Sequence, residues 1–477
     1  MLASKLAIIY YAIIIEDKNY LGVIYMSVLN LKYKLRVYFL FSLALLVVGC
    51  GSSTSGGSSS PTPANNLLVW TKQVGVESGS TYGRGISTDE EGNSYITGDT
   101  DISLPGQTER GNLDYFLAKY SESGFLLWTR QAGVESAYTG GIGVSTDVQG
   151  NIYITGYTSG QISESIGESS LYDYFLAKYT ESGVLLWTKQ VGSGFPTGIT
   201  VGYAVSTDVQ GNAYITGYTN ESISGQIQSG LSDYFVAKYS ESGAMLWTKQ
   251  VGAESSGYTS GNGISVDAQG NAYISGLTTE SISDQTQSGL RDYFVAKYSE
   301  SGAMLWTKQV GAASSSGSTA GNGITLGIDS NIYITGYTNE SISGQTQSGI
   351  EDYFIAKYNE SGALLWTRQA GTESGETRGI GINADLYGNI YVTGYTNESL
   401  SDQIESGTRD YFIAKYNQSG VLLWTRQVGA ESGYTDGFGV STDALGNAYI
   451  SGSTNVGISG QTQTGEFDYF IAKYYPN

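Results

Sequence analysis

Runs of alternating apolar and polar residues recur along most of the chain. One set comprises residues 143–147 (GVSTD), 151–157 (NIYITGY), 173–179 (DYFLAKY) and 184–191 (VLLWTKQV), separated by segments rich in Gly, Asn and Ser. Runs of β-branched and aromatic residues bounded by such turn residues predict β-strands. The third and fourth runs are apolar at both odd and even positions, so the predicted sheet must be covered on both of its faces.

This set of strands recurs at intervals of 58 to 60 residues, each copy marked by a Trp-Thr-Lys/Arg-Gln segment. The segment contains every tryptophan of the chain: Trp70, Trp128, Trp187, Trp247, Trp306, Trp366 and Trp424. So regular a period predicts an array of one structural unit. Because identical sheets packed radially cover each other's faces, we expect an all-β fold, a seven-bladed β-propeller with four antiparallel strands per blade.

The two ends of the array are out of phase with each other. Residues 67–75 form a fourth strand that follows no third strand, and residues 468–474 form a third strand that precedes no fourth strand. We expect the N-terminal strand to pair with the C-terminal strands, which completes the seventh blade and leaves no open sheet edge. The propeller is therefore predicted to span residues 67–477.

Residues 1–49 have a different character from the array. A basic cluster at residues 32–36 precedes an apolar run over residues 37–48, the pattern of an export signal peptide and too short for a comfortable membrane span. Residues 47–50 (VVGC) resemble the lipobox of bacterial lipoproteins, which implies that Cys50 carries a lipid and becomes the mature N-terminus. The alternative is a chance cysteine after a secretory signal.

The first 25 residues fit no signal peptide, whereas Met26 stands a few residues before the basic cluster. We therefore expect translation to start at Met26. Detection of a peptide from residues 1–25 would contradict this expectation.

Residues 50–66 (CGSSTSGGSSSPTPANN) are uncharged and almost free of apolar side chains, so we expect a flexible tether. Such a tether spans roughly 20 to 25 Å. From residue 50 onward the chain holds 19 basic and 42 acidic residues (24 minus 5 and 44 minus 2), a net charge of -23. Anionic lipid should repel this body, which leaves the lipid on Cys50 as the expected membrane attachment.

Composition excludes several classes of function. The net charge of the whole chain, -20, argues against a nucleic-acid partner, which would require clustered Lys and Arg. The chain has no His, which excludes Ser-His-Asp catalysis and His-ligated zinc. Cys50 is the only cysteine, so no intramolecular disulfide can form. We expect no catalytic residues, no metal site and no cofactor.

Charged residues inside the repeat suggest ion pairs across the last hairpin of each blade. Asp173, at the start of a third strand, should fall opposite or within a residue of Lys189. The other predicted pairs are Asp114 with Arg130, Asp233 with Lys249, Asp292 with Lys308, Asp352 with Arg368, Asp410 with Arg426 and Asp468 with Lys72. Each exposed pair would contribute about 0.2 to 1 kcal/mol.

The motifs GNIYITGYT, DYFLAKY, ESGALLWTRQ and GISTD resemble the seven-bladed β-propeller repeat family called SBBP, over residues 67–477. The resemblance implies a seven-bladed ring, and the family has no general catalytic motif to transfer. One repeat departs from the pattern, because Leu326-Gly327 replaces the usual Thr-Asp or Val-Asp, so we expect the turn there to be built differently. The Gly-x-Leu-Leu-Trp run is more weakly similar to quinoprotein propellers and to lipoprotein propellers that scaffold outer-membrane assembly.

The predicted topology places all long loops on one rim. The tight turns (DVQG and TESG) share one end of the blade, whereas the loop after the second strand and the link between blades share the other. Binding residues are usually carried by such loops.

Repeat proteins place function where the repeats differ, so positions that vary on this rim are our candidate binding residues. A Gly-x-Gly-like slot before each innermost strand holds Arg84, Ile142, Tyr203, Asn262, Asn322, Ile380 and Phe438. The links between blades add Tyr82, Tyr138, Phe195, Tyr258, Arg378 and Tyr434. Tyr and Arg suit a protein or sugar surface because they offer large amphipathic areas at low entropic cost. The alternative is that these loop residues vary under weak constraint.

Two other patterns have simpler explanations. The Asp-x-x-Gly-Asn run, as at Asp147 to Asn151, lacks the alternating carboxylates of a calcium loop and fits a hairpin turn. Carboxylates outside the consensus could supply an acid and a base for glycoside cleavage, but they lie in different blades without visible pairing. They are Asp99, Asp101, Glu109, Asp284, Asp402 and Asp436.

We therefore expect a lipid-anchored propeller of the bacterial outer membrane or cell surface. In this hypothesis it is a monomer that binds an unidentified protein or polysaccharide through its long-loop rim, without chemistry of its own. One alternative is a periplasmic scaffold that holds other envelope proteins. The other is a hydrolase or a quinone-dependent enzyme.

Overall fold

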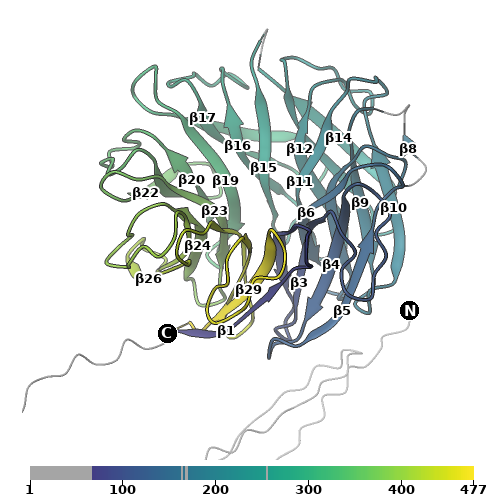
Figure 1. Cartoon of the computed structure of the whole chain (residues 1–477). Coiled ribbons are helices and arrows are strands. Elements are labelled where there is room, and N and C mark those ends of the chain that lie inside the picture. The colour runs from purple at the N-terminus through teal and green to yellow at the C-terminus, as the bar shows by residue number, and fades with distance from the viewer. Residues whose placement is uncertain (1–66, 163–164, 167–169, 254–255, 477) are drawn as a thin grey trace, which may run out of the picture. The chain divides into compact units, whose positions relative to one another are not determined.

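The computed structural model describes residues 67–162, 165–166, 170–253 and 256–476. These residues form seven sheets arranged as blades around a central axis (Figure 1). In five blades the strands are hydrogen-bonded in chain order from the axis outward, and blades 2 and 7 differ only in their outermost strand. The predicted all-β seven-bladed propeller is confirmed. The predicted signal peptide, Cys50 and the tether lie outside the described residues. The described residues include no helix long and apolar enough to cross a membrane.

The first three blades contain thirteen strands. Blade 1 consists of β2 (Thr81–Thr88), β3 (Ser94–Thr100), β4 (Asp114–Tyr120) and β5 (Leu126–Ala132). Blade 2 consists of β6 (Thr139–Thr146), β7 (Ile152–Thr158), β9 (Asp173–Tyr179) and β10 (Leu185–Val191), with the two-residue strand β8 (Ser165–Ile166) added outside β10. Blade 3 consists of β11 (Thr200–Thr207), β12 (Ala213–Thr219), β13 (Asp233–Tyr239) and β14 (Met245–Val251).

The next three blades repeat the pattern with four strands each. Blade 4 consists of β15 (Thr259–Val266), β16 (Ala272–Thr278), β17 (Asp292–Tyr298) and β18 (Met304–Val310). Blade 5 consists of β19 (Thr319–Leu326), β20 (Ile332–Thr338), β21 (Asp352–Tyr358) and β22 (Leu364–Ala370). Blade 6 consists of β23 (Thr377–Ala384), β24 (Ile390–Thr396), β25 (Asp410–Tyr416) and β26 (Leu422–Val428).

Blade 7 closes the ring as predicted. Its inner strands are β27 (Thr435–Thr442), β28 (Ala448–Thr454) and β29 (Asp468–Tyr474), and its outer strand is β1 (Leu68–Val74). β1 pairs antiparallel with β29 from Leu68 opposite Tyr474 to Val74 opposite Tyr469. Figure 1 shows these two strands side by side, the N-terminal β1 in purple and the C-terminal β29 in yellow. The closure leaves neither terminal strand of the array with an open inner edge.

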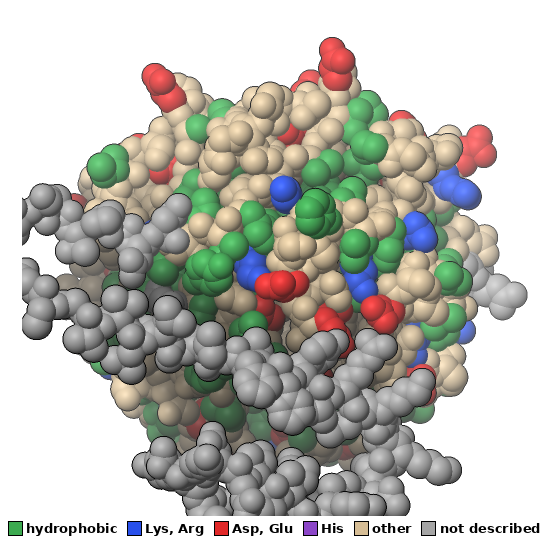
Figure 2. Space-filling view, turned by 90° about the horizontal axis from the view of Figure 1, so that it is seen from below, with side chains coloured by type: hydrophobic (Ala, Val, Ile, Leu, Met, Phe, Trp, Pro, Cys, Tyr) green, Lys and Arg blue, Asp and Glu red, His purple; other side chains and the backbone are tan. Residues whose placement is uncertain are grey.

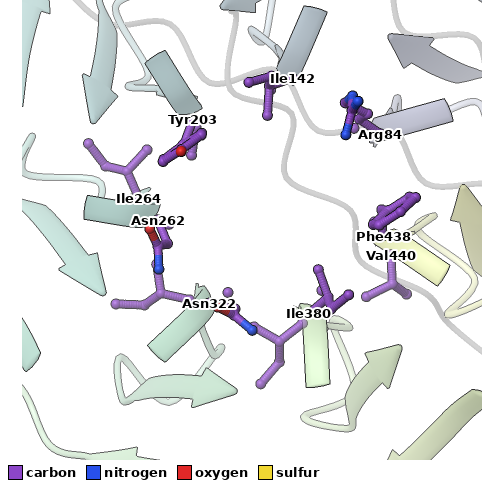
Figure 3. Close-up of a pocket in the computed structure, with 18 of the residues that line it drawn as sticks. Arg84, Ile142, Tyr203, Asn262, Ile264, Asn322, Ile380, Phe438 and Val440 are labelled. Atoms are coloured by element: carbon purple, nitrogen blue, oxygen red, sulfur yellow. The ribbon is translucent and has the colours of Figure 1, made fainter. Parts of the chain in front are cut away.

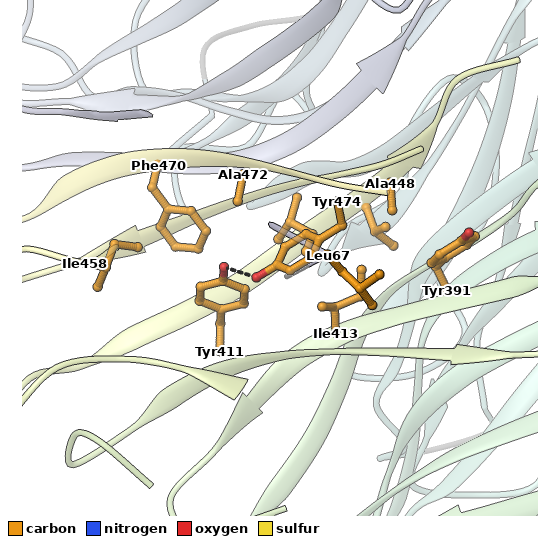
Figure 4. Packing of buried hydrophobic residues seen from close by; sticks show 11 residues of the cluster. Leu67, Tyr391, Tyr411, Ile413, Ala448, Ile458, Phe470, Ala472 and Tyr474 are labelled. Carbon is orange, nitrogen blue, oxygen red and sulfur yellow. Dashed lines mark hydrogen bonds between the residues drawn. The ribbon is translucent and has the colours of Figure 1, made fainter. Parts of the chain in front are cut away.

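Neighbouring blades are joined by a hydrogen bond between two buried tyrosines. The first Tyr of each third strand meets the last Tyr of the next blade's third strand, as where Tyr174 Oη lies 2.7 Å from Tyr239 Oη. The contact occurs seven times with oxygen–oxygen distances of 2.5 to 2.8 Å. Figure 4 shows the Tyr411–Tyr474 pair inside one apolar cluster, with Phe470 and Ile413 beside it. Burial raises the pKa of Tyr174 well above its ordinary value, so the hydroxyls stay neutral.

A buried lysine from each third strand forms a second connection between blades. Lys178 Nζ lies 5.0 Å from the centre of the Tyr153 ring, 3.8 Å from Asp147 and 3.3 Å from Glu241 of the next blade. The equivalent lysines of the other blades also lie over a second-strand tyrosine. On the face seen in Figure 2, basic and acidic side chains lie beside each other among hydrophobic ones.

The seven predicted Asp–Lys/Arg pairs do not form. In the ladder Lys189 stands opposite Leu176, and the buried Asp173 instead accepts a hydrogen bond of 2.8 Å from Gln190 Nε2. Each equivalent Asp takes the same Gln of the Trp-Thr-Lys/Arg-Gln segment as its partner. In six blades the Asp also accepts backbone N–H bonds from the preceding loop, as Asp233 does from Ser229 and Gly230. The aspartates therefore join the long loops to the glutamines of the outer strands and leave the outer-strand Lys and Arg unpaired with them.

The turn that lacks the usual Asp is built differently, as the sequence predicted. In blade 2, Asp147 accepts hydrogen bonds from the backbone and side chain of Asn151 and from Tyr153. In blade 5, Asp329 comes two residues later in the turn and accepts the matching bonds from Asn331 and Tyr333. Asp329 thus provides the carboxylate that the usual Asp provides in the other blades, although it stands two residues later in the chain.

Candidate functional site

The two ends of the ring differ in their connections. At one end, which we call the tight-turn end, the hairpins between first and second strands and between third and fourth strands close within a few residues, as at Asp147–Asn151 and Thr180–Val184. The opposite end, called the long-loop end, holds every connection from second to third strand and from blade to blade, such as residues 101–113 and 133–138. The predicted clustering of long loops on one rim is confirmed.

The seven slot residues lie within the innermost strands, not before them. Each innermost strand begins about four residues earlier than expected, because a β-bulge keeps the Gly-x-Gly segment in the ladder. In β6 the register shifts between Gly141 and Gly143, so Ile142 is the extra residue. The same shift occurs in β2, β11, β15, β19, β23 and β27. The bulge frees the slot residue from the requirements of strand pairing.

All seven slot residues line one cavity of about 570 Å³ on the propeller axis. Figure 3 shows Arg84, Ile142, Tyr203, Asn262, Asn322, Ile380 and Phe438 arranged around it, each from a different blade. A second set of aliphatic residues, two positions further along each innermost strand, lines the same cavity: Ile86, Val144, Val205, Ile264, Ile324, Ile382 and Val440. We call this cavity the funnel. The funnel therefore has two rings of side chains: the slot residues, which are of mixed type, and the second set, which is entirely aliphatic.

Two of the slot side chains are fixed by the neighbouring blade. Asn262 donates from Nδ2 to the backbone oxygen of Gly321 at 2.9 Å, and Asn322 donates to that of Gly379 at 2.8 Å. Asn262 also accepts a hydrogen bond of 2.8 Å from Ser260. These amides are therefore held in position before any ligand arrives.

Arg84 is the single basic slot residue, and it forms an ion pair with Asp99 at the end of β3. Its guanidinium also lies 5.7 Å from the centre of the Tyr82 ring. Tyr82 and Arg378 were predicted in the links between blades, but both lie inside innermost strands, β2 and β23. The bulges explain this error, because they extend those strands back into the predicted links.

The remaining link residues divide between the funnel and the outer rim. Tyr258 lines the funnel, whereas Tyr138, Phe195 and Tyr434 are exposed by 47%, 54% and 42% and do not line it. Backbone bridges to the preceding blade hold Tyr138, Tyr258 and Tyr434, as Tyr138 is held by Leu113. The structure therefore brings nine of the thirteen candidate positions together at the funnel: the seven slots, Tyr258 and Arg378.

Sequence reasoning selected Arg378 and Tyr434 but missed the row of alternating tyrosines and arginines to which they belong, at the funnel mouth. The Arg378 guanidinium lies 4.3 Å from the Tyr337 ring centre and 6.0 Å from that of Tyr395. The Arg409 guanidinium lies 4.1 Å from the Tyr395 ring centre and 5.6 Å from that of Tyr434. We call these five residues the Arg–Tyr row.

A signal for this row was present in the sequence. Each second strand ends in a Gly-x-Thr segment whose middle residue differs between repeats, as the slot residue does. The seven middle residues are Asp99, Tyr157, Tyr218, Leu277, Tyr337, Tyr395 and Ser453. The same rule that selected the slots would have selected Tyr337 and Tyr395.

Both arginines of the row have a carboxylate partner. Arg378 pairs with Glu351, and Arg409 lies 3.2 Å from both oxygens of Asp436. Burial raises the pKa of the Asp436 carboxyl, although Arg409 opposes that shift. The pairing neutralises the row while keeping its donors and acceptors side by side.

The nonconsensus carboxylates do not converge on one another. Asp99 and Asp436 face their own arginines, and Asp101 accepts the backbone N–H of Ser80 at 2.7 Å. Among the residues that the structure describes, no group of three acidic side chains is placed to hold a metal ion.

Comparison with known proteins agrees with the ring. The model of the β-propeller repeat called SBBP matches the chain seven times, at residues 69–105, 127–162, 186–223, 246–282, 305–342, 365–400 and 423–458. The chain belongs to the SBBP family. Each match covers the outer strand of one blade, the link and the first two strands of the next blade, so the SBBP unit is offset from the structural blade.

Two curated proteins share this SBBP chain's sequence pattern. An uncharacterized WD repeat-containing protein of Acanthamoeba polyphaga mimivirus is 25% identical over 447 residues, covering 73% of this chain and 32% of the relative. The regulatory protein FlaEY of Caulobacter vibrioides is 24% identical over 442 residues, covering 83% of this chain and 44% of the relative. The chain spans less than half the length of either relative.

Solved structures also resemble the SBBP ring. A catalytically inactive virginiamycin B lyase from Staphylococcus aureus matches with a TM-score of 0.47 and 10% identity, over 84% of this chain and 98% of its own. An ulvan lyase matches with a TM-score of 0.48 and 12% identity, over 83% and 97%. Likeness of this extent carries no information about activity.

Proposed function

We propose that this SBBP propeller is a non-catalytic module that binds a macromolecule through its long-loop end. The observation that carries the proposal is the convergence of the variable positions on one funnel, whereas the buried contacts between blades are nearly the same in every blade. Tight-turn residues such as Val148, Leu386 and Leu445 also vary between repeats, but they are exposed and do not line the funnel. Concave sites with a few fixed polar groups on a largely apolar wall are the usual form of a binding site.

The proposal includes attachment of the protein by a lipid on Cys50 to the bacterial outer membrane or cell surface. Its support is the signal-like segment and lipobox-like residues 47–50. The chain enters the propeller at Leu67, at the start of an outer strand and therefore at the tight-turn end.

A triple substitution tests the binding role. We would express the full chain with Arg84, Tyr203 and Phe438 all changed to Ala and compare proteins captured from envelope extracts and binding to surface polysaccharide. A matched control changes Val148, Val209 and Leu445 to Ala. These three residues are exposed in turns at the opposite end. The proposal expects binding to be lost only in the funnel variant, and equal capture by both variants would refute it.

Protease treatment of intact cells tests the location. If the propeller is digested while a periplasmic marker survives, the funnel faces the environment. If it is protected, the protein is instead a periplasmic scaffold, and capture should then recover envelope proteins. Incorporation of labelled lipid into the wild type and not into Cys50→Ser tests the anchor itself.

A further inference from the structure

We propose that the funnel and the Arg–Tyr row bind an uncharged, hydroxyl-rich glycan chain, with one end of the chain in the funnel and the following sugars along the row. This inference rests on the proposed binding function and names its ligand class. Three properties of the site lead to it: the charge of the mouth, the pairing of its polar groups, and the shape of the row.

The charge of the mouth argues against charged polymers. Four arginines lie at the mouth. Arg84, Arg378 and Arg409 each already face a carboxylate, so a ligand anion there would have to displace Asp99, Glu351 or Asp436. The fourth, Arg291, donates a hydrogen bond of 3.2 Å to Tyr337 Oη. The exposed carboxylates of the surrounding loops, among them Glu109, Asp284 and Glu405, would repel a polyanion before it reached the mouth. A polycation would be drawn to those loops rather than to the arginines at the centre.

The polar groups at the site suit hydroxyls. A sugar hydroxyl both donates and accepts hydrogen bonds, so it is best satisfied where a donor and an acceptor stand together. The pair of Arg378 with Glu351 and the pair of Arg409 with Asp436 offer that combination. Asn262 and Asn322 add amides that are already fixed by the next blade. A protein contact does not require donors and acceptors to stand together in pairs.

The row forms a strip of stacked planar groups that extends from the funnel to the surface. Tyr337, Arg378 and Tyr395 line the funnel, whereas Tyr434, at the far end of the row, is 42% exposed. Planar side chains offer large, rigid contact areas and lose little conformational entropy on binding, which suits the flat CH-bearing faces of sugar rings. A continuous strip suits a chain better than a small molecule that the funnel would enclose.

A second aromatic group lies across the funnel. Tyr203 and Tyr218 ring centres are 5.6 Å apart, and Tyr218 and Tyr258 centres are 6.0 Å apart. Together with the aliphatic ring below, this group gives the first sugar of the chain an apolar wall. The volume of about 570 Å³ is within the range of sites for ligands of a few rings.

Calorimetry on the full chain in detergent tests the ligand class. The neutral probes are hexamers of glucose in α and β linkage, of xylose and of mannose; an anionic galacturonic acid hexamer and a cationic glucosamine hexamer are the charged probes. We expect at least one neutral hexamer to bind with an affinity that changes less than twofold between 50 and 500 mM salt. Binding of a charged probe would instead weaken steeply over that range.

Two substitutions in one blade locate the binding. Tyr395→Ala should weaken the neutral hexamer at least tenfold, whereas Tyr387→Ala, at an exposed tyrosine in the tight turn of the same blade, should not change it. Arg378→Ala, which leaves Glu351 without its partner, should also weaken binding.

Four results would overturn the glycan inference: no neutral binding at 10 mM probe, binding of the charged probes alone, steep salt dependence, or equal loss in Tyr387→Ala. Capture of a protein partner that is lost in the Arg84, Tyr203 and Phe438 variant, with no glycan bound, would retain the binding function while refuting the glycan. Loss of neither ligand in that variant would refute both.

Discussion

The tight-turn end and the long-loop end are made from the same repeat, yet their charges differ sharply. Each blade places one Lys from its third strand and one Lys or Arg from its fourth at the tight-turn end, 14 basic residues in seven blades. The same end holds 14 acidic residues: Asp89, Glu90, Glu91, Glu122, Asp147, Glu181, Asp208, Glu241, Asp267, Glu300, Asp329, Glu360, Asp385 and Asp443. The tight-turn end therefore has no net charge.

The long-loop end carries the excess of acid. Of the 19 basic residues of the propeller, 5 remain for this end (19 minus 14). Of the 42 acidic residues, 28 remain (42 minus 14). Three of these, Glu164, Glu168 and Glu254, lie outside the described residues, which leaves 25 at this end. Four of the five arginines, Arg84, Arg291, Arg378 and Arg409, make contacts with tyrosines or acids at the funnel mouth.

The comparison shows how a repeat separates stability from recognition. At the tight-turn end, a buried lysine pairs with a carboxylate in six of the seven blades, and Lys415 binds the backbone oxygen of Pro476 instead, so a change there should be costly. At the long-loop end, Asp–Gln hydrogen bonds hold the loops in every blade, and bulges present a different side chain each time. Substitutions at that end should alter binding while leaving the ring intact.

The largest expected effect comes from opening the ring. Deleting residues 67–75 removes β1, its ladder with β29, and Trp70, which donates to the backbone oxygen of Glu122 in blade 1. We expect a loss of more than about 5 kcal/mol in unfolding free energy or failure to fold. Deleting residues 51–66 is the control. Equal melting temperatures for the two deletions, measured by calorimetry, would refute the importance of closure.

A single buried lysine should have the next largest effect. Lys238 lies between Asp208 at 3.8 Å and Glu300, with both Lys238 and Asp208 side chains 1% exposed. Lys238→Ala leaves Asp208 buried without its cation, which should cost about 3 to 5 kcal/mol in a denaturant titration. Arg409→Ala, at a half-exposed pair of the long-loop end, should cost only about 1 kcal/mol. Equal losses of unfolding free energy in the two variants would contradict the proposed difference between the tight-turn end and the long-loop end.

The funnel variant should give the reverse result. Changing only Tyr203 and Phe438 to Ala should weaken ligand binding at least tenfold and lower the unfolding free energy by less than about 2 kcal/mol, because both side chains border open space. Arg84 is kept in this variant because its loss would leave the buried Asp99 without its cation. Circular dichroism and calorimetry would measure the stability. A melting temperature as low as that of Lys238→Ala would mean that the slots are structural.

The smallest expected effect is on the stability of the protein at low pH, through Asp329. Burial alone would raise the pKa of Asp329, but hydrogen bonds from Lys357 and Asn331 lower it to about 2. A lowered folded-state pKa contributes stability above the unfolded pKa of about 4, and that stability is lost as the pH falls toward 2. Asp329→Asn should therefore reduce the pH dependence of the melting temperature between pH 4 and 2, and an unchanged slope would contradict the assignment.

The seven-bladed ring could be predicted from the sequence because the same strand pattern occurs seven times. Strand order, closure and the clustering of long loops all follow from periodicity and turn length, as the pairing of β1 with β29 shows. The slot residues were found by their variation, although the bulge that places Ile142 at the funnel was not, since a bulge depends on pairing with the neighbouring strand.

The errors share one cause. Pairing the third-strand Asp with the fourth-strand Lys or Arg assumed that opposite charges near each other in a hairpin meet. A buried aspartate such as Asp233 is instead satisfied by the side-chain amide of Gln250 and by backbone N–H groups of the loop. The Arg–Tyr row as a whole was missed because its members come from blades 5, 6 and 7, and only the packing of consecutive blades brings their side chains into contact.

The entry of the chain at Leu67 has a mechanical consequence. β1 runs from the tight-turn end to the long-loop end, antiparallel to β29. If the segment before Leu67 is held and a ligand on the opposite end is pulled, tension runs along β1 and loads its hydrogen bonds with β29 in shear. Single-molecule pulling between these points should give a higher rupture force than pulling β1 sideways from its C-terminal end. The ladder that closes the ring would then share the load among all its bonds at once, instead of opening one bond at a time.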